Sequence, residues 1–121
     1  MKIVNGTDIV EISRIKKDIE TLGEKFLNRI YTENEIKYCE SKKNQKYQSY
    51  AARFAAKEAI YKALSEYIKG EYSWKDFEVL NTDSGKPNVN LKIRIDELED
   101  ISLTLSHSKE YAVANVVAIY K

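Results

Sequence analysis

Small and apolar residues recur at helical spacing in the middle of the chain, over Tyr50–Leu64. This stretch is rich in strong helix formers and contains neither glycine nor proline, so it predicts a long central helix. At about 100° per residue, one side of the helix carries a stripe suited to the core, made of Ala52, Ala56, Ala59, Ile60, Ala63, Leu64 and Tyr67.

The opposite side of this helix carries Glu58 and Lys62 one turn apart. Their neighbours are small or aromatic: Ala51, Ala55, Phe54 and Tyr61. We expect the alanines to leave room for a bulky ligand and the rings to line a pocket wall. The alternative is an ordinary surface ion pair, which contributes a few tenths of a kcal/mol.

Strict alternation along Lys2–Ile12 predicts an N-terminal strand. Asp8 falls on the same face as Val4, Val10 and Ile12, and a carboxylate buried there needs a cation or several hydrogen-bond donors. Gly6, on the same face, has no side chain and would let a ligand approach the backbone. The alternative is that Asp8 caps a turn after a shorter strand or meets solvent.

Three shorter helices are predicted between this strand and the central helix. Ser13 is placed to cap a helix that runs to Gly23, and Glu24–Tyr31 continues as a second helical piece. Thr32–Glu35 has the sequence of a capping box, which predicts a third helix from Glu33.

Two antiparallel hairpins are predicted after the central helix. The strand Phe77–Thr82 is followed by the turn sequence Asp83–Pro87 and by renewed alternation over 89–93. The second hairpin joins the strand 101–107 to Tyr111–Tyr120 through a turn at Ser108–Glu110. The order of strand, helices and antiparallel strands predicts an α+β fold in a single domain, residues 1–121.

His107 ends the apolar face of its strand, where the chain leaves the sheet. Functional sites often form at such places. The alternative is a histidine that is satisfied within the core or at the sheet edge.

Composition narrows the function classes. The chain has 121 residues, 43% of them hydrophobic, which suits one core, and 20 Lys plus Arg against 19 Asp plus Glu argue against nucleic acid or membrane partners by global charge. A local basic loop, Ser41–Lys46, precedes the central helix and is suited to a phosphate. Cys39 is the only cysteine and is expected to be a packed or half-exposed thiol without a catalytic role. With no apolar run near the roughly 20 residues of a membrane span, we expect a soluble, cytoplasmic protein.

Four motifs in order resemble a known family. Gly6–Val10, Arg53–Leu64, Gly85–Pro87 and Leu105–Ala112 are similar to the successive signatures of the small phosphopantetheinyl transferases of the holo-[acyl-carrier-protein] synthase type. The resemblance covers essentially the whole chain and implies the fold of that family. It also implies an activity, in which the 4′-phosphopantetheine arm of coenzyme A is transferred to a serine of apo acyl carrier protein and adenosine 3′,5′-bisphosphate is released.

The resemblance further implies roles for individual residues. Asp8 and Glu58 would hold Mg²⁺ on the pyrophosphate, Lys62 would contact the reacting phosphate, and His107 would lie near the nucleotide phosphates. Magnesium commonly takes one or two carboxylates plus phosphate oxygens and water, which agrees with such a site. We expect Glu58, or a water that it holds, to take the proton of the carrier serine. Arg14 is implied as a contact for the acidic recognition helix of the carrier.

Coenzyme A binding is assigned by resemblance and local sequence to a larger set: Lys43, Lys46, Arg53, Lys62, Gly85, Lys86, Pro87, His107 and Ser108, with Lys42 a further candidate for the 3′-phosphate. Small members of the family are usually homotrimers with active sites between subunits. The chain departs from the family pattern at Ser65, where glycine is common, and Val10 replaces the second acid of the larger, two-lobed relatives. The rival interpretation is a non-catalytic module that binds an acidic protein or RNA.

Overall fold

The computed structural model describes all residues, 1–121, and has the predicted α+β architecture. Its strands and α-helices are, in chain order, β1 (Lys2–Glu11), α1 (Ile12–Leu22), α2 (Glu24–Ile30), α3 (Glu33–Glu40), α4 (Lys46–Leu64), β2 (Phe77–Asn81), β3 (Pro87–Leu91), β4 (Leu98–His107) and β5 (Tyr111–Tyr120). None of the helices combines the length and the apolar character that crossing a bilayer demands.

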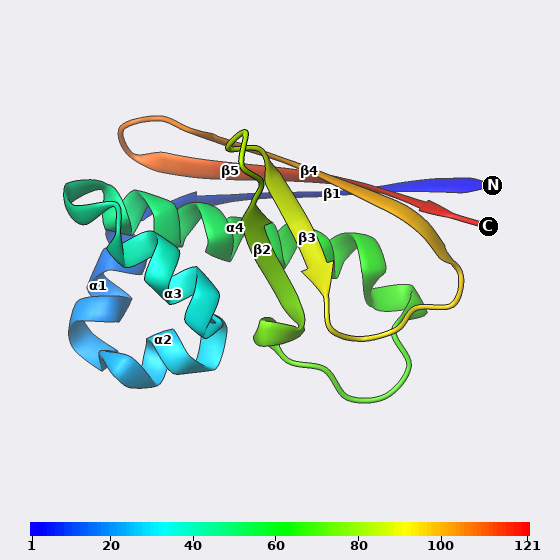
Figure 1. Cartoon of the computed structure of the whole chain (residues 1–121), viewed down its shortest axis with the longest axis horizontal. Coiled ribbons are helices and arrows are strands. Elements are labelled where there is room, and N and C mark those ends of the chain that lie inside the picture. Colours follow the sequence, from blue (N-terminus) through cyan, green and yellow to red (C-terminus); the bar gives the residue numbers. More distant parts are fainter.

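Helix α4 runs along one face of an antiparallel sheet with strand order β1-β5-β4. The short helices α1 to α3 lie on the other side of α4 from this sheet, and the hairpin β2-β3 crosses α4, with β3 in contact with β4 (Figure 1). In the register of β1 with β5, Gly6 lies opposite Val116 and Asp8 opposite Ala114. Strands β2 and β3 pair in antiparallel fashion, and so do β4 and β5, so both predicted hairpins are confirmed.

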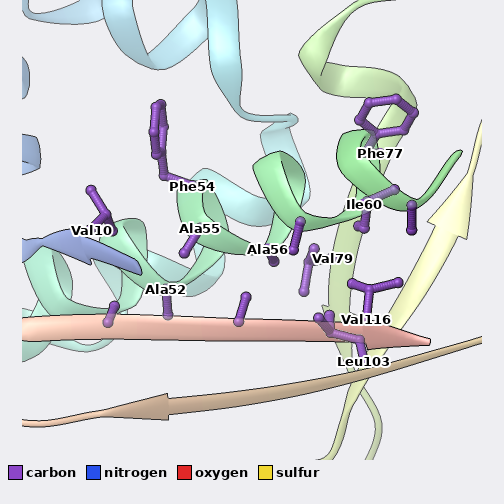
Figure 2. Close-up of a cluster of buried hydrophobic side chains, with 14 of the residues drawn as sticks. Val10, Ala52, Phe54, Ala55, Ala56, Ile60, Phe77, Val79, Leu103 and Val116 are labelled. Atoms are coloured by element: carbon purple, nitrogen blue, oxygen red, sulfur yellow. The ribbon is translucent and has the colours of Figure 1, made fainter. Parts of the chain in front are cut away.

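The core extends to both sides of α4: Val116 and Leu103 lie on the side of the sheet, and Phe54 and Phe77 lie on the other side of the helix (Figure 2). Small residues predominate on both sides of the contact between the sheet and α4: Ala112, Ala114 and Ala118 on β5 face a helix that contains Ala52, Ala55, Ala56, Ala59 and Ala63. Small side chains let the strand and helix backbones approach closely.

Gly6 marks the tightest point of this approach. A Cβ atom added at Gly6 would lie 1.9 Å from the carbonyl oxygen of Ala59 and 3.1 Å from the amide nitrogen of Ala63. We expected a ligand to use the space above Gly6, and this expectation is wrong, because the backbone of α4 fills it.

The predicted start of α3 is confirmed, whereas the predicted starts of α1 and α4 are corrected. The capping box is confirmed, since Thr32 Oγ1 accepts from Glu35 N at 3.2 Å and the Glu35 carboxylate accepts from Thr32 N at 2.9 Å. Ser13 does not cap α1, which begins one residue earlier, at Ile12, without a side-chain cap. The central helix begins at Lys46, four residues before the predicted start.

The predicted open space beside Glu58 is also corrected. Ala51 and Ala55 are fully buried, so neither leaves room for a ligand. Helix α4 is enclosed by protein on nearly all sides because α1, α3 and β2 cover the face that the sheet leaves free. Cys39 is a free, buried thiol, as expected.

Replacing Gly6 with alanine tests the role of the tight approach. We expect Gly6→Ala to lower the free energy of unfolding by about 3 kcal/mol, because the added methyl group overlaps a helix backbone that cannot move alone. Urea denaturation followed by circular dichroism measures this change. Lys2→Ala, at an exposed position of the same strand, is the control and should cost much less; equal losses for the two variants would contradict the assignment.

Candidate active site

Strand β1 and helix α4 bring Asp8 and Lys62 into direct contact. Lys62 Nζ donates to Asp8 Oδ1 at 3.1 Å and to the carbonyl oxygen of Thr7 at 2.8 Å. The Asp8 side chain is 18% exposed and that of Lys62 is 49% exposed, so the pair lies where the contact between β1 and α4 reaches the surface. The structure thus gives Asp8 the cation that its apolar strand face requires.

Glu58 belongs to the same group of charges. Burial raises the pKa of the Glu58 carboxyl above its ordinary value, and the nearby Asp8 carboxylate raises it further, while Lys62 and Arg14 act in the opposite direction. These pKa effects place two acids and two bases within electrostatic reach of one another. We call Asp8, Glu58 and Lys62 the phosphate cluster.

The two acids of the phosphate cluster suit a magnesium ion. No group of three or more His, Cys, Asp or Glu side chains is assembled in the chain. Mg²⁺ retains water and is commonly bound through one or two carboxylates plus substrate phosphates. The repulsion between Asp8 and Glu58 is the kind of interaction that a shared cation relieves.

A second group of predicted residues surrounds a separate cavity of about 320 Å³. Lys42, Arg53, Gly85, Pro87 and His107 all line this nucleotide cavity, as we name it, although they come from widely separated parts of the chain. No aspartate or glutamate lines it, so its charge favours an anion.

Arg53 is held firmly in the wall of the nucleotide cavity. Its guanidinium donates to Ser49 Oγ at 3.2 Å and to Asn81 Oδ1, and it lies 4.1 Å above the Tyr38 ring. The Nε atom of Arg53 is buried and has no hydrogen-bond partner. His107 is fixed by Gln48, whose Nε2 lies 2.8 Å from His107 Nδ1.

Five of the residues predicted for coenzyme A do not line the nucleotide cavity: Lys43, Lys46, Lys62, Lys86 and Ser108. Lys46 instead pairs with Glu40 at 3.5 Å. Ser108 Oγ accepts from the backbone amide of Tyr111 at 3.2 Å and stabilises the β4-β5 turn. Within one chain, the nucleotide cavity and the phosphate cluster share no residue.

Sequence reasoning missed a buried ion pair next to Glu58. Lys57 Nζ lies 2.8 Å from Glu35 Oε1 and donates to the carbonyl oxygens of Trp74 at 3.0 Å and Phe77 at 2.9 Å, and both charged side chains are fully buried. Burial lowers the pKa of Lys57, and Glu35 opposes that shift. A signal was available, because Lys57 is three residues before Ile60 and seven before Leu64, on the core side of the helix.

Aromatic side chains line a cavity next to Glu58, and the predicted Tyr61 is one of them. A cavity of about 240 Å³ lies between α4 and the segment Tyr72–Phe77, and we call it the aromatic cavity. Glu58 and Tyr61 line it from the helix side. Phe54 is instead buried and stacks on the Trp74 ring at 5.2 Å.

The fold is that of a phosphopantetheinyl transferase. Residues 5–116 match the model of the 4′-phosphopantetheinyl transferase superfamily, and the chain belongs to this family. Its similarity extends to the holo-[acyl-carrier-protein] synthase of Ruminiclostridium cellulolyticum, with 48% identity over 97% of this chain and 92% of the relative. The synthase of Chlamydia felis is 46% identical over 94% of each chain.

Solved structures agree with this assignment. The chain is similar to the holo-[acyl-carrier-protein] synthase of Helicobacter pylori in complex with coenzyme A, with a TM-score of 0.83 and 33% identity over 96% of this chain and all of that one. The synthase of Bacillus anthracis, also in complex with CoA (3′,5′-ADP), has a TM-score of 0.78 and 43% identity over 94% and 93% of the two chains.

The raised pKa of Glu58 predicts that this residue lowers the free energy of unfolding by an amount that depends on pH. The folded protein holds this proton more tightly than the unfolded chain, so the contribution of Glu58 to stability decreases as the pH rises above its ordinary pKa of 4.5. Glu58→Gln removes that cost. We therefore expect the variant to gain stability relative to the native protein between about pH 4 and pH 7, measured by urea denaturation without divalent ions. Glu99→Gln, on the exposed strand β4, is the control, and a difference for Glu58→Gln that does not change with pH would contradict the interpretation.

Proposed function

We propose that this chain transfers the 4′-phosphopantetheine group from coenzyme A to a serine hydroxyl of apo acyl carrier protein. The observation that carries the proposal is the convergence of Asp8, Glu58 and Lys62, which come from two distant segments of the chain, beside a cavity. The chain also belongs to a family in which relatives that match it over nearly the full length bear the name of this activity. The free, buried Cys39 suits a reducing compartment, and we place the reaction in the cytoplasm.

We infer that Asp8 and Glu58 hold Mg²⁺ against the pyrophosphate of coenzyme A. When bound, Mg²⁺ supplies positive charge that offsets the negative charge of the transferring phosphoryl group. Lys62 already donates to Asp8, and its ammonium can turn toward a phosphate oxygen at the same place.

Glu58 is suited to act as the general base. Burial and the Asp8 carboxylate bring the pKa of Glu58 closer to neutral pH, which favours proton transfer from a hydroxyl group. In the proposed step the serine oxygen bonds to the phosphorus atom that carries pantetheine, and the bond from phosphorus to the bridging oxygen breaks. The serine proton passes to Glu58, and adenosine 3′,5′-bisphosphate leaves.

The nucleotide cavity is proposed to bind the adenosine 3′-phosphate. Arg53 and Lys42 supply positive charge there. Lys43, Lys46, Lys86 and Ser108 do not line this cavity, and any contact from them must come from another direction.

We propose that the protein works as a homotrimer. The outer face of the sheet exposes Ile3 and Ile9, each 61% exposed, and pairs them with Ile119 and Val113 of β5, so apolar side chains are left without cover at both ends of β1. Subunit contact there would let the nucleotide cavity of one chain meet the phosphate cluster of the next. Sedimentation equilibrium should give three times the 14.0 kDa chain mass; a monomer at micromolar concentration would contradict it.

A direct transfer assay tests the proposed function. The protein is incubated with coenzyme A, Mg²⁺ and apo acyl carrier protein, and intact-mass spectrometry is used to look for one added phosphopantetheine. We expect the adduct with the native protein and a rate at least about 100-fold lower with Glu58→Gln. No adduct on a carrier that is competent with another transferase would overturn the proposal.

Arg14 is proposed to contact the carrier. Its guanidinium lies 5.9 Å above the Phe54 ring on the exposed side of α1, where an acidic helix can reach it. We expect Arg14→Ala to raise KM for the carrier about 10-fold and to change KM for coenzyme A little. Lys17→Ala, also exposed on α1, is the control. Equal increases in both KM values would show that Arg14 acts on the phosphate cluster instead.

A further inference from the structure

The first turn of α4 holds two groups of the nucleotide cavity in place. Ser49 Oγ accepts a hydrogen bond from the Arg53 guanidinium at 3.2 Å, and the neighbouring Gln48 reaches His107, with 2.8 Å between Gln48 Nε2 and His107 Nδ1. All four residues line the cavity. A guanidinium offers only hydrogen-bond donors to a ligand, whereas what a histidine offers depends on which ring nitrogen carries the proton.

The contact with Gln48 determines the position of that proton. The nitrogen of a side-chain amide carries two hydrogens and can only donate, so His107 Nδ1 accepts this hydrogen bond and is unprotonated. In the neutral imidazole the proton is then on Nε2. No aspartate or glutamate lines the cavity to compete for the ring. The amide therefore selects one tautomer of His107.

This arrangement leaves Nε2 of His107 for a ligand. His107 is the last residue of β4 and is exposed, and Nε2 is the ring nitrogen further from the backbone. An Nε2–H group donates to a phosphate oxygen, whereas the other tautomer would present a lone pair to it. Because Gln48 is an amide, it orients the ring without adding negative charge to a cavity that favours an anion.

We propose that Gln48 is a positioning residue, which holds His107 in the Nε2–H tautomer so that the neutral ring donates to a phosphate of the bound nucleotide. This inference rests on the proposed function, which places the adenosine 3′-phosphate in the nucleotide cavity. The groups of the cavity then differ in their roles. Arg53 and Lys42 supply positive charge, and His107 supplies a hydrogen-bond donor with a fixed direction.

Nitrogen NMR tests the tautomer directly, because His107 is the only histidine and its two ring nitrogens give one pair of signals. At about pH 8, where an imidazole is neutral, we expect a protonated Nε2 and an unprotonated Nδ1 in the native protein. Gln48→Leu, at a half-buried position, should give signals averaged over both tautomers. A protonated Nδ1 in the native protein, or native signals in Gln48→Leu, would overturn the proposal.

Gln45→Leu is the matched control for this measurement. Gln45 lines the same cavity three residues earlier and has no hydrogen bond to His107. Its replacement removes the same amide from the cavity wall and should leave both ring signals as they are in the native protein. A change in the His107 tautomer equal to that in Gln48→Leu would show that the tautomer does not depend on the contact with Gln48.

A double-mutant cycle tests the role of Gln48 in binding, with calorimetric titration of adenosine 3′,5′-bisphosphate as the measurement. We expect Gln48→Leu to weaken binding about 5-fold and His107→Ala about 10-fold. Because Gln48 acts through the ring, Gln48→Leu should cause no further loss in the His107→Ala background. The same loss in both backgrounds would overturn the proposal. Failure of the native protein to transfer phosphopantetheine in the mass assay would instead refute the proposed function, and the NMR signals, which need no substrate, are read separately.

Discussion

The contact between the backbones of β1 and α4 is the constraint on which the site depends. Glycine is the only residue type that fits at position 6, because the Cβ atom of any other residue would meet the carbonyl oxygen of Ala59. Asp8 is two residues further along the same face of the strand, and Lys62 is one turn after Glu58 on the helix. Bringing the two backbones together therefore brings these three charged groups together as well. A packing requirement thus determines the geometry of a chemical site.

Two consecutive residues of α4 illustrate how burial is used in opposite ways. Lys57 is fully buried, but it has a carboxylate and two carbonyl oxygens as partners, so its charge is compensated and holds three parts of the chain together. Glu58 is partly buried beside another acid, so its charge is costly in the free protein. The uncompensated acid is the one we assign to chemistry. The compensated base supports the cavity beside it.

Several elements were predicted correctly from local patterns alone. The capping box at Thr32, the two hairpins and the alternation of β1 each involve residues close together in the chain, and each element is present. Alternation indicated only that Asp8 needs a cation or several hydrogen-bond donors, and its convergence with Glu58 and Lys62 was implied by the resemblance.

Features that arise only from tertiary contact were not predictable in the same way. The role of Gly6 depends on a helix more than fifty residues later in the chain. The burial of Ala51 depends on elements that precede α4 in the chain and on others that follow it. Ser13 has the right residue type for a helix cap, but the helix begins before it. Lys43 and Lys46 are basic and close in sequence to the nucleotide cavity, yet neither lines it. Residue type alone does not determine side-chain direction.

The central claim is that Asp8 and Glu58 bind one divalent ion between them. Crystals grown with coenzyme A and Mn²⁺, in place of Mg²⁺, allow this ion to be located by its anomalous scattering. The account predicts a single strong peak within about 2.2 Å of an oxygen of each carboxylate and of the pyrophosphate. A peak that contacts only one of the two acids, or none at this position with coenzyme A bound, would contradict it.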